Sequence, residues 1–521
     1  MMHRKQIGIQ AIVLVITWFI SMTPGFTQEE DAYNNYITFL ERYRTIISGK
    51  EVFVRTKYLM EQEVSLSLPH QENVAAAIKA PYTLKTLLEL LIKNDPSVKA
   101  AEQGVLVALG SLDGAKAMRL PVIKLETSGT YIGNPPGPIV VKKGEFGIVD
   151  NPLMPGTSVY LPPGDVKIYD GMEHTLYQFK IIGDIPLWTW GKLGLGIDAG
   201  YINVQAAELA VKKIKHEKSI RLRGIVETLG YLQEVEQILK LEQALGARLI
   251  MISEQNKKAG FITETDLLSI KINIKEIDIG LIELKEQKQK LLAELSSMTG
   301  LANLTIENIA LTVPALEIMP ISDKEMLCAQ AVLGNYDLLL GSVYIEAKQK
   351  LVELARIQAK GLPDFGVHVE ATYSGPRFPL LETDWARKDD YQVTVSIANQ
   401  GNILGNPQKK ADAEKAQAEL DEARAQLCDG QAALNITVEQ SLSTMEMLSA
   451  RIEYALLKQE LYNTNLVQKK ITIAMGSGSE ADFLQDIITA LTALTEAYNY
   501  CINYRTQLLT LDVLIGTGTL E

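Results

Sequence analysis

The residue types that bind nucleotides are present in this sequence, but their spacing does not favour that chemistry. Gly194, Gly196 and Gly200 form a Gly-x-Gly-x3-Gly pattern that is similar to a dinucleotide-binding loop. The second spacing is one residue too long, and no strand-helix-strand unit surrounds the pattern. We therefore expect a flexible junction between a strand and a helix at this point, and no cofactor.

The residues that bind metals or act as nucleophiles are dispersed along the chain. No histidine lies near a cysteine in a ligand pattern, and the five are His3, His70, His174, His216 and His368. The three cysteines are odd in number and far apart, which fits neither a disulfide framework nor a zinc site; they are Cys328, Cys428 and Cys501. No Gly-x-Ser-x-Gly or P-loop sequence occurs. The sequence therefore predicts neither a catalytic nor a metal site, and no enzyme.

Composition and proline placement point to long helices. The chain of 521 residues carries 51 basic and 63 acidic side chains, a net charge of −12, which argues against a nucleic-acid partner. Its 47% apolar content excludes a disordered chain. All 19 prolines lie in 1–186 or 314–407, so 187–313 and 408–521 contain none. Because proline breaks helix interiors, the proline-free stretches predict long helices.

The first 27 residues have the features of a secretory signal peptide. Arg4 and Lys5 precede an apolar run, 7–20, of fourteen residues. A run of that length is too short to span a membrane comfortably. The alternative is an uncleaved anchor. No other segment approaches about eighteen unbroken apolar residues, which argues against a helical membrane protein.

The second half of the chain repeats the first. A helical pattern opens at Asn94 and again at Asn335, and each ends at a proline that is followed ten residues later by a tyrosine. Further on, Gly260 and Gly476 are each followed by an aspartate six residues later and by a glycine forty residues later. Self-similarity on this scale predicts two structural units with the same plan.

Each repeat contains segments that alternate with period two, as strands do. The segments 122–131 and 365–373 are apolar on one side and polar on the other, and 177–181 and 391–397 alternate likewise. Strands of about ten residues that end in tyrosine are typical of a transmembrane barrel with lipid outside and water inside. The charged residues expected to line the lumen are Lys124, Glu126, His368 and Glu370. A soluble, half-buried hairpin is the alternative.

Four strands cannot close a barrel, since about eight are needed to enclose a lumen. An open strand edge is not tolerated in lipid. The barrel would therefore be shared, with eight strands from two chains or twelve from three. The residues alone leave both numbers open.

The helical stretches are too long for a compact domain. The 68 residues of 191–258 would form a rod of about 100 Å, and 407–474 is just as long. A coiled-coil seam with 4-3-4-3 spacing runs along the returning helix at Ile270, Ile274, Ile277, Leu281 and Leu284. A second set, Ile272, Ile279 and Ile282, lies off that seam. Two seams predict neighbours on both sides, as in a wall of helices; a single antiparallel coiled-coil rod is the alternative.

The ordered pattern of 82–516 resembles the TolC family of outer membrane efflux proteins. The resemblance implies a mostly helical α+β fold, in which long antiparallel helices form an α-barrel across the periplasm. Each chain would supply four strands to a twelve-stranded transmembrane β-barrel of a homotrimer in the outer membrane. It also implies a passive exit duct of a tripartite efflux or type I secretion system, with a periplasmic adaptor and an inner-membrane transporter as partners. A periplasmic coiled-coil scaffold or adaptor without a barrel is the alternative.

The resemblance also assigns functions to the turns at the periplasmic end. Turns of small residues would receive the adaptor, and the matching residues are Ala259, Gly260, Phe261, Met475, Gly476 and Ser477. A glycine there would equally serve as an ordinary helix C-cap. The periplasmic aperture would be lined by Thr265, Asp266, Asp482 and Gln485, with Asp482 forming a ring of three charges. The alternative for Asp482 is that it favours the start of the last helix through the macrodipole.

These expectations divide the chain into segments. They are a signal peptide (1–27), an N-terminal extension without an assigned role (28–80), a first repeat (81–300) with a hairpin at 122–186, an equatorial linker (301–333), a second repeat (334–516) with a hairpin at 364–398, and a C-terminal tail (517–521). The Pro/Gly-rich stretch 133–164 is expected to be an outer loop that plugs or shields the mouth of the barrel.

Overall fold

The computed structural model describes most of the chain. The described residues are 27–49, 52–53, 81–316, 318, 324–375, 378, 391–400 and 407–517. The expected signal peptide, apart from Thr27, lies outside them. So do 54–80 of the expected extension and the last four residues of the expected tail.

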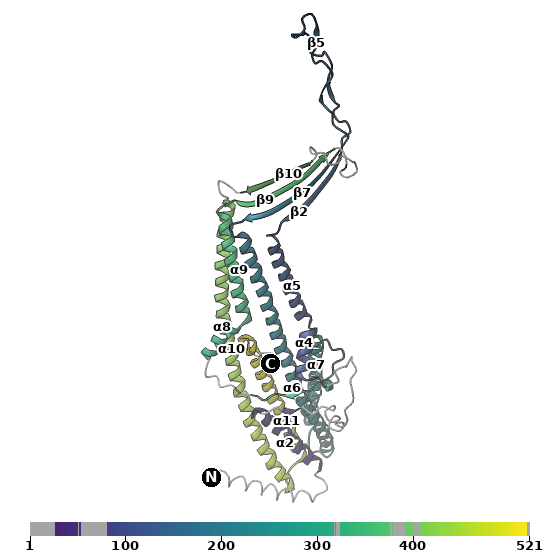
Figure 1. Cartoon of the computed structure of the whole chain (residues 1–521). Helices are drawn as coiled ribbons and strands as arrows, with labels where there is room; N and C mark the ends of the chain where they lie inside the picture. Colours follow the sequence, from purple (N-terminus) through teal and green to yellow (C-terminus); the bar gives the residue numbers. More distant parts are fainter. Residues whose placement is uncertain are drawn as a thin grey trace, which may run out of the picture. The chain divides into compact units, whose positions relative to one another are not determined.

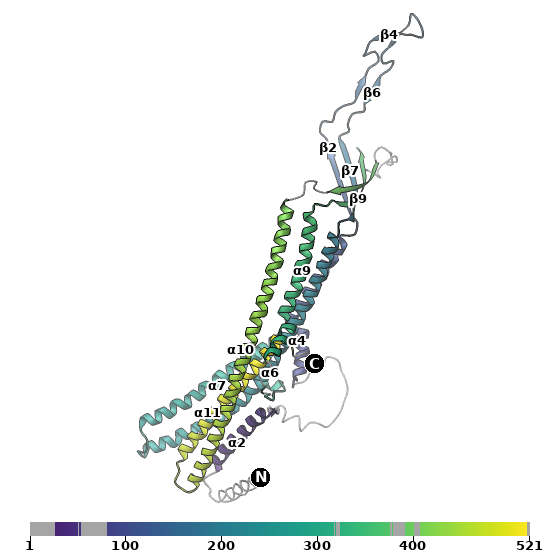
Figure 2. The same cartoon turned by 90° about the vertical axis from the view of Figure 1, so that its left-hand side faces the viewer.

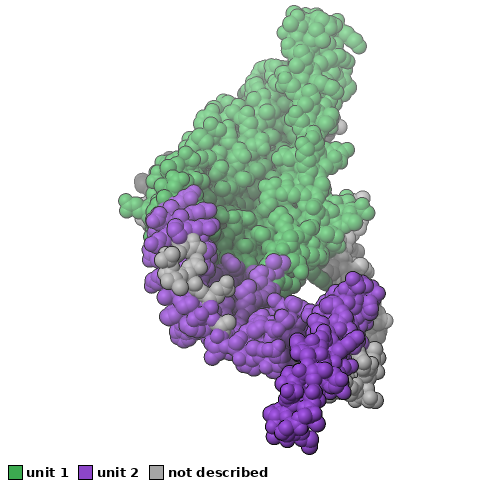
Figure 3. Space-filling view, turned by 90° about the horizontal axis from the view of Figure 1, so that it is seen from above, with its two compact units in different colours: residues 1–106, 205–344, 423–521 green, residues 107–204, 345–422 purple. Residues whose placement is uncertain are grey.

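The chain forms two compact units (Figure 3). Unit 1 comprises Met1–Leu106, Gln205–Tyr344 and Ala423–Glu521, and unit 2 comprises Val107–Val204 and Ile345–Glu422. Within the described residues, unit 1 contains the helical tips and the buried core, and unit 2 contains the four-stranded sheet. Four helices cross the boundary between the units: α5 (Pro96–Ala117), α6 (Lys192–Lys258), α9 (Tyr336–Ala359) and α10 (Pro407–Ala474).

The longest helices follow the absence of proline. The α6 helix has 67 residues and α10 has 68, and their bounds differ from the expected ones by at most one residue. The helix α7 (Glu264–Thr299) returns from α6, and α11 (Glu480–Ile515) returns from α10, so each repeat ends in a helical hairpin (Figure 2). Both returning helices have 36 residues and end at a glycine with positive φ, Gly300 and Gly516. Glycine takes this left-handed C-cap geometry without the strain that a side chain would add.

The remaining α-helices are short, with 21 residues in α2 and 11 each in α4 and α8. They are α2 (Thr27–Ile47), α4 (Leu84–Asn94) and α8 (Lys324–Gly334), with a single 3-10 turn at Ile306–Asn308. The two-residue strands β1 (Val52–Phe53) and β8 (Thr312–Val313) pair with each other. Among the described residues, no single helix is both long and apolar enough to cross a membrane. The helices α8 and α9 reach the required length and apolar content only when they are taken together, and the chain bends by 48° between them.

The duplication is visible in the contacts that open each repeat. Asn94 Nδ2 donates to the Thr299 carbonyl at 2.8 Å, and Asn335 Nδ2 donates to the Leu514 carbonyl at 3.1 Å. In both repeats an asparagine just before a helix, α5 or α9, therefore ties this part of the chain to the end of the returning helix. The neighbouring Asp95 caps α5 through its carboxylate, with Ser97 N at 2.7 Å.

Helices α6 and α11 come from different repeats and run antiparallel, side by side, in unit 1. Arg505 Nε donates to Glu227 Oε2 at 2.6 Å near one end, and Arg248 donates to Glu480 Oε1 at 2.9 Å near the other. The core around α11 is aromatic: the rings of Tyr43 and Tyr498 lie 5.4 Å apart. This packing joins the two hairpins of one protomer.

The four long strands form one antiparallel sheet in the order β10-β9-β7-β2 (Figure 1). Their bounds are β2 (Val122–Tyr131), β7 (Thr175–Trp188), β9 (Asp364–Gly375) and β10 (Tyr391–Gln400). The first coincides with the expected strand, and the other three are longer than expected. The register places the alternating apolar residues of all four strands on one face and the polar residues on the other.

The stretch expected to be a loop is instead an extended two-stranded ribbon. Between β2 and β7 the chain forms β3 (Ile139–Val141), β4 (Ile148–Asp150), β5 (Ser158–Tyr160) and β6 (Val166–Tyr169), with β3 paired to β6 and β4 to β5. Its prolines and glycines lie mostly in the turns and irregular stretches between runs of β-branched residues. The expectation of a plain loop over 133–164 was therefore wrong.

Candidate functional site at the helical tips and on the polar face of the sheet

The turn between α6 and α7 is a glycine-terminated helix end. Gly260 has φ +83° and donates to the Lys257 carbonyl at 2.9 Å, and Phe261 N donates to the Asn256 carbonyl at 2.9 Å. These bonds satisfy the last carbonyls of the helix, as in a Schellman cap. Ala259 still belongs to the helical ladder, with its N–H on the Gln255 carbonyl. The Phe261 side chain is 80% exposed, and nothing lies within 4 Å of the position that a Cβ on Gly260 would take.

The turn between α10 and α11 has the same geometry. Gly476 has φ +79° and donates to the Ile473 carbonyl at 2.8 Å, and Ser477 N donates to the Thr472 carbonyl at 3.2 Å. Met475, which precedes the glycine, is 71% exposed. The two tips therefore present an exposed apolar side chain beside an open glycine. The C-cap role of both glycines is observed, and it leaves their outer surface free for a partner.

The two returning helices start differently, and the difference separates their aspartates. Thr263 and Asp266 form a capping box, in which Asp266 Oδ2 accepts from Thr263 N at 2.9 Å and from Thr263 Oγ1 at 2.7 Å. The backbone and side-chain hydrogen bonds from Thr263 lower the pKa of the Asp266 carboxyl. The adjacent Thr265 is exposed, and its carbonyl accepts from Ser269. Asp266 is thus engaged in local helix capping.

Asp482 occupies the corresponding position of α11 but does not complete a capping box. Its backbone N–H lies 3.4 Å from Ser479 Oγ, so Ser479 is the N-cap. Within the described part of the chain, the Asp482 carboxylate has no hydrogen-bond or ion-pair partner, and the residue is exposed. Gln485 is half-buried beside it. Its carboxylate is therefore free to interact with ions in solution.

Two charged groups near the tip of α11 were not singled out from the sequence. Asp486, one helical turn after Asp482, forms an ion pair with Lys469 of α10. Glu480 forms the 2.9 Å pair with Arg248 of α6, which links the second hairpin to the first. The Asp-x3-Asp spacing could have drawn attention to Asp486. The Arg248 pair could not be found by spacing, because its partners lie 232 residues apart.

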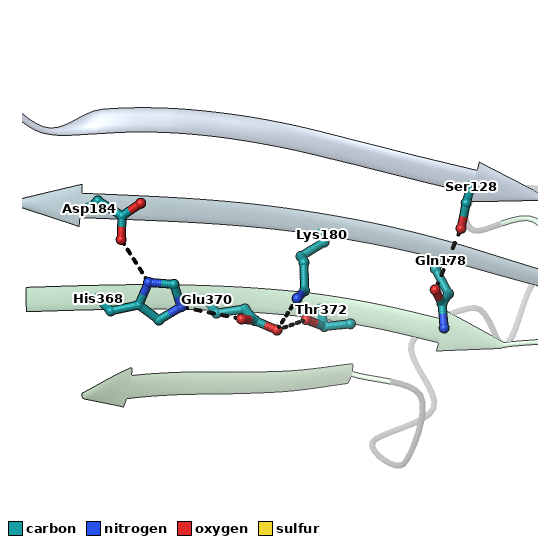
Figure 4. A network of polar contacts seen from close by, with 7 residues as sticks. All are labelled: Ser128, Gln178, Lys180, Asp184, His368, Glu370 and Thr372. Carbon is teal, nitrogen blue, oxygen red and sulfur yellow. Dashed lines mark hydrogen bonds and ion pairs between the residues drawn. The ribbon is translucent and has the colours of Figure 1, made fainter. Parts of the chain in front are cut away.

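The polar face of the sheet carries a chain of charged contacts (Figure 4). His368 Nδ1 lies 2.7 Å from Asp184 Oδ1, and His368 Nε2 lies 3.3 Å from Glu370 Oε2. Lys180 Nζ lies 3.0 Å from Glu370 Oε1, which also accepts from Thr372 Oγ1 at 2.9 Å. The structure thus brings together two of the four predicted lumen residues. Asp184 was missed because Ile182 interrupts the polar alternation just before it.

The other two predicted lumen residues lie on the same face of β2. Lys124 is opposite Ile182, which in turn is opposite Glu370, and Glu126 is opposite Lys180. Ser128 Oγ lies 3.5 Å from Gln178 Oε1 farther along the same pair of strands. Both signs of charge are therefore arranged in rows across the polar face, as on a surface that faces water.

The opposite face is apolar and is bounded by aromatic residues at both ends. At the end next to the ribbon, the rings of Tyr373 and Tyr391 lie 5.0 Å apart, and Phe179 lies 6.2 Å from Tyr373. At the other end, Trp188 pairs in register with Phe365. From Phe365 to Tyr373 is eight residues, or about 26 Å along the strand at about 3.3 Å per residue. An apolar band of roughly 25 Å between aromatic girdles is typical of an outer-membrane barrel.

The comparisons with known proteins identify the fold. No protein-family model and no curated protein sequence matches the chain. Among solved structures, the CmeC outer membrane channel of Campylobacter jejuni matches with a TM-score of 0.64 and 15% identity, over 87% of this chain and 94% of that one. The outer membrane protein VceC of Vibrio cholerae matches with a TM-score of 0.62 and 16% identity, over 84% of this chain and 96% of that one. The open state of the MtrE outer membrane channel of Neisseria gonorrhoeae matches with a TM-score of 0.61 and 11% identity, over 91% of this chain and 96% of that one.

These matches span nearly the whole of each channel protein. The chain therefore has the fold of outer membrane channels, and the expected mostly helical α+β fold class with four long strands is confirmed. At such low identities, the likeness establishes the fold and not the activity.

Proposed function

We propose that this protein is an outer membrane channel: a passive exit duct through which an inner-membrane transporter and a periplasmic adaptor discharge their substrate. The observation that carries the proposal is the sheet of unit 2, with one apolar face between aromatic ends and one charged face. The fold shared with outer membrane channels supports it independently. The channel has no catalytic role in this scheme, and the energy comes from its partners.

The unpaired edges of the sheet require further copies of the chain. In the order β10-β9-β7-β2, the outer strands β10 and β2 each pair on one side only among the described strands. Lipid cannot satisfy backbone N–H and C=O groups, so each free edge needs a strand from another protomer. Three copies give a closed barrel of twelve strands, which is wide enough for a lumen lined by the charged face.

Apolar stripes on the helices of unit 1 support the same assembly. On α7, the off-seam residues Ile272, Ile279 and Ile282 are exposed, whereas Ile274 and Ile277 of the seam are buried. A second exposed stripe with heptad spacing lies on α10, at Met447, Tyr454 and Leu461. Contiguous apolar rows on a protomer surface mark packing surfaces. We assign them to contacts between neighbouring copies in a helical barrel.

The soluble alternative is a periplasmic scaffold in which this sheet packs against a protein partner. It would leave the aromatic girdles and the outward-facing Val393, Val395 and Ile397 without a function. Heat-modifiable migration on gels and extraction from outer membranes only by detergent would support the channel. A mature protein that remains in the water-soluble fraction would support the scaffold.

The Asp482 ring is the proposed ion filter at the periplasmic end. Asp482→Ala is expected to raise single-channel conductance in planar bilayers and to weaken block by multivalent cations, because three carboxylates at a constriction bind cations tightly and slow their passage. Asp482→Asn is the matched control for size. If the charge is responsible, the asparagine variant behaves like the alanine variant; unchanged conductance and block in both would contradict the assignment.

The Arg248–Glu480 pair is the proposed latch between the two hairpins of a protomer. Arg248→Ala is expected to raise the fraction of time that single channels spend open, because it removes an ion pair that holds the start of α11 against α6. The effect is modest, since both side chains are partly exposed and such pairs contribute about 0.2–1 kcal/mol. Glu480→Gln should raise the open fraction by the same amount, and the double variant Arg248→Ala/Glu480→Gln should show no further rise. Fully additive effects would mean that the two residues act separately.

The tips are the proposed adaptor contact. A photo-crosslinking amino acid at position 261 or 477 is expected to capture the periplasmic adaptor in living cells, because both positions flank an open glycine at an exposed turn. The matched control is position 286 of α7, which is exposed and pairs only locally with Lys290. Equal capture at 286, or none at either tip, would contradict the assignment.

A further inference from the structure

The ribbon between β2 and β7, residues 132–174, is an ordered arm and not a loose loop. Its two sides are hydrogen-bonded from the base to near the tip: Ile132 N donates to the His174 carbonyl at 2.7 Å, and Asn151 N donates to the Thr157 carbonyl at 2.8 Å. Between these lie the β3–β6 and β4–β5 ladders. Figure 1 shows the ribbon continuing beyond the ends of β2 and β7.

The ribbon is apolar on both faces, unlike the sheet from which it extends. In the β4–β5 ladder, Ile148 lies opposite Tyr160 on one face, and Val149 lies opposite Val159 on the other. At the tip, Leu153 is 89% exposed, and between the two ladders Phe146 is 74% exposed. Strands with consecutive apolar residues are normally covered on both faces. Within one protomer, the described residues leave the apolar residues of β4 largely uncovered: Ile148 is 59% exposed and Val149 is 49% exposed.

We propose that the ribbons of the three protomers pack against one another above the mouth of the barrel, so that each covers the apolar faces of its neighbours. This proposal rests on the proposed function, because it requires the trimer. An isolated two-stranded hairpin is only marginally stable in water, whereas three or more strands with a shared apolar face are stable.

The reach of the ribbon permits this contact. From 132 to 151 the chain advances twenty residues, or about 65 Å at roughly 3.3 Å per residue. A twelve-stranded barrel with strands about 4.8 Å apart and tilted by about 40° has a radius of roughly 12 Å. The ribbons therefore need to incline only slightly to meet over the axis. Each begins directly after β2, the edge strand that must pair with the neighbouring copy, so the ribbon contact continues the barrel contact.

The charges of the ribbon do not oppose association. Between 132 and 174 there are three lysines and five carboxylates, so the net charge is only −2. Several of these groups are already engaged within the ribbon: Lys167 pairs with Asp170 at 2.5 Å, and Asp165 Oδ1 accepts from Lys143 N at 2.8 Å. A membrane or polyanionic partner would instead call for an unpaired basic surface. The apolar, nearly neutral surface fits a second copy of itself.

The test is cysteine cross-linking of the full chain in intact cells. Val149→Cys is introduced into a variant with Cys328→Ser and Cys428→Ser, while the fully buried Cys501 is kept. A short bismaleimide is expected to convert most of the protein into covalent dimers, since one reactive cysteine per protomer joins two of three chains. The matched control, Ile123→Cys, lies on the apolar outer face of β2 and should remain monomeric on denaturing gels.

The outcomes separate this proposal from the proposed function. Covalent dimers of the Val149→Cys variant, in a protein that forms pores, support it. Absence of these dimers, or cross-links only to other proteins, in a protein that still forms trimeric pores overturns the ribbon contact alone. A parent protein that forms neither trimers nor pores overturns the proposed function and the ribbon contact with it.

Discussion

Glu242→Gln is expected to stabilise the protein above pH 7 and to remove the part of the pH dependence of its unfolding that Glu242 contributes. Glu242 of α6 is 1% exposed, and its Oε1 has no hydrogen-bond partner among the described residues. Burial raises the pKa of this carboxyl to about 8, and the neighbouring Thr492 hydroxyl on α11 only partly opposes that shift. The carboxyl is therefore protonated in the folded protein at neutral pH, although it is ionised in the unfolded chain.

The direction of the pH effect follows from that difference. Because the folded pKa is raised, the contribution of Glu242 to stability is fully present below about pH 4.5, the ordinary value for the unfolded chain, and is lost as the pH rises to about 8. The loss amounts to roughly 3–5 kcal/mol at about 1.4 kcal/mol per pKa unit. Gln has a neutral side chain of the same size, so the Glu242→Gln variant avoids this loss of stability.

The measurement is denaturant unfolding of the detergent-purified protein between pH 5 and pH 9, for the parent and the variant. The two should be similar at pH 5 and diverge as the pH rises, with the variant more stable. Glu286→Gln, on the exposed surface of α7, is the control and should stay within about 0.5 kcal/mol of the parent at every pH. Parallel curves for parent and Glu242→Gln would show that Glu242 does not titrate as described.

Arg42→Ala is expected to release the N-terminal helix α2 from the helical body. Arg42 Nη1 donates to both oxygens of Glu234 on α6, at 3.0 and 2.8 Å, and the Glu234 side chain is fully buried. Burial raises the pKa of Glu234, and Arg42 opposes that rise. Removing the guanidinium leaves an unpaired buried carboxylate, which costs about 3 kcal/mol. Because about 1.4 kcal/mol corresponds to a tenfold change in an equilibrium constant, the locally opened state of α2 should become about 100-fold more populated.

Limited proteolysis within α2 measures this opening, and cleavage should accelerate more at pH 8 than at pH 5, where Glu234 is more readily protonated. The double variant Arg42→Met/Glu234→Leu is the matched control. It removes both charges and should restore most of the protection, because an apolar pair of similar volume avoids the buried charge. Equal cleavage of the single and double variants would assign the effect to lost packing and not to the charge.

These contacts give the N-terminal extension a structural role that its sequence did not reveal. The α2 helix contacts α10 through the Tyr36 hydroxyl, which lies 3.1 Å from Gln459 Oε1, and contacts α6 through Arg42. It therefore touches both hairpins of unit 1. The amphipathic character of 28–47 could be recognised from the sequence, but nothing in the pattern named the surface that it covers. The position of a docked helix depends on contacts with residues far away in the chain, which a local sequence pattern does not record.

The elements with the clearest periodic signal were the best predicted. Helix α10 begins at Pro407, the expected residue, because proline is favoured in the first turn of a helix and excluded from its interior. Strand β2 coincides with the expected 122–131, where the alternation is complete. Strand β7 was predicted too short, because Ile182 and Gly183 break the alternation that resumes at Asp184.

The ribbon and the links between hairpins were beyond sequence reasoning for different reasons. In the ribbon, prolines and glycines obscured strands of only three or four residues, which are too short for a periodic signal. The Arg248–Glu480 pair joins residues 232 apart, and no local pattern records such a neighbour. Tip residues such as Gly260 were easier to find, since a glycine between two helical patterns predicts a helix end.

The proposed function requires that copies of this chain form a water-filled pore across a membrane. Single-channel recording of the purified full chain in planar bilayers tests it most directly. We expect discrete current steps whose conductance increases in the Asp482→Ala variant. Preparations of folded protein that give no current steps, in parent and variant alike, would contradict it.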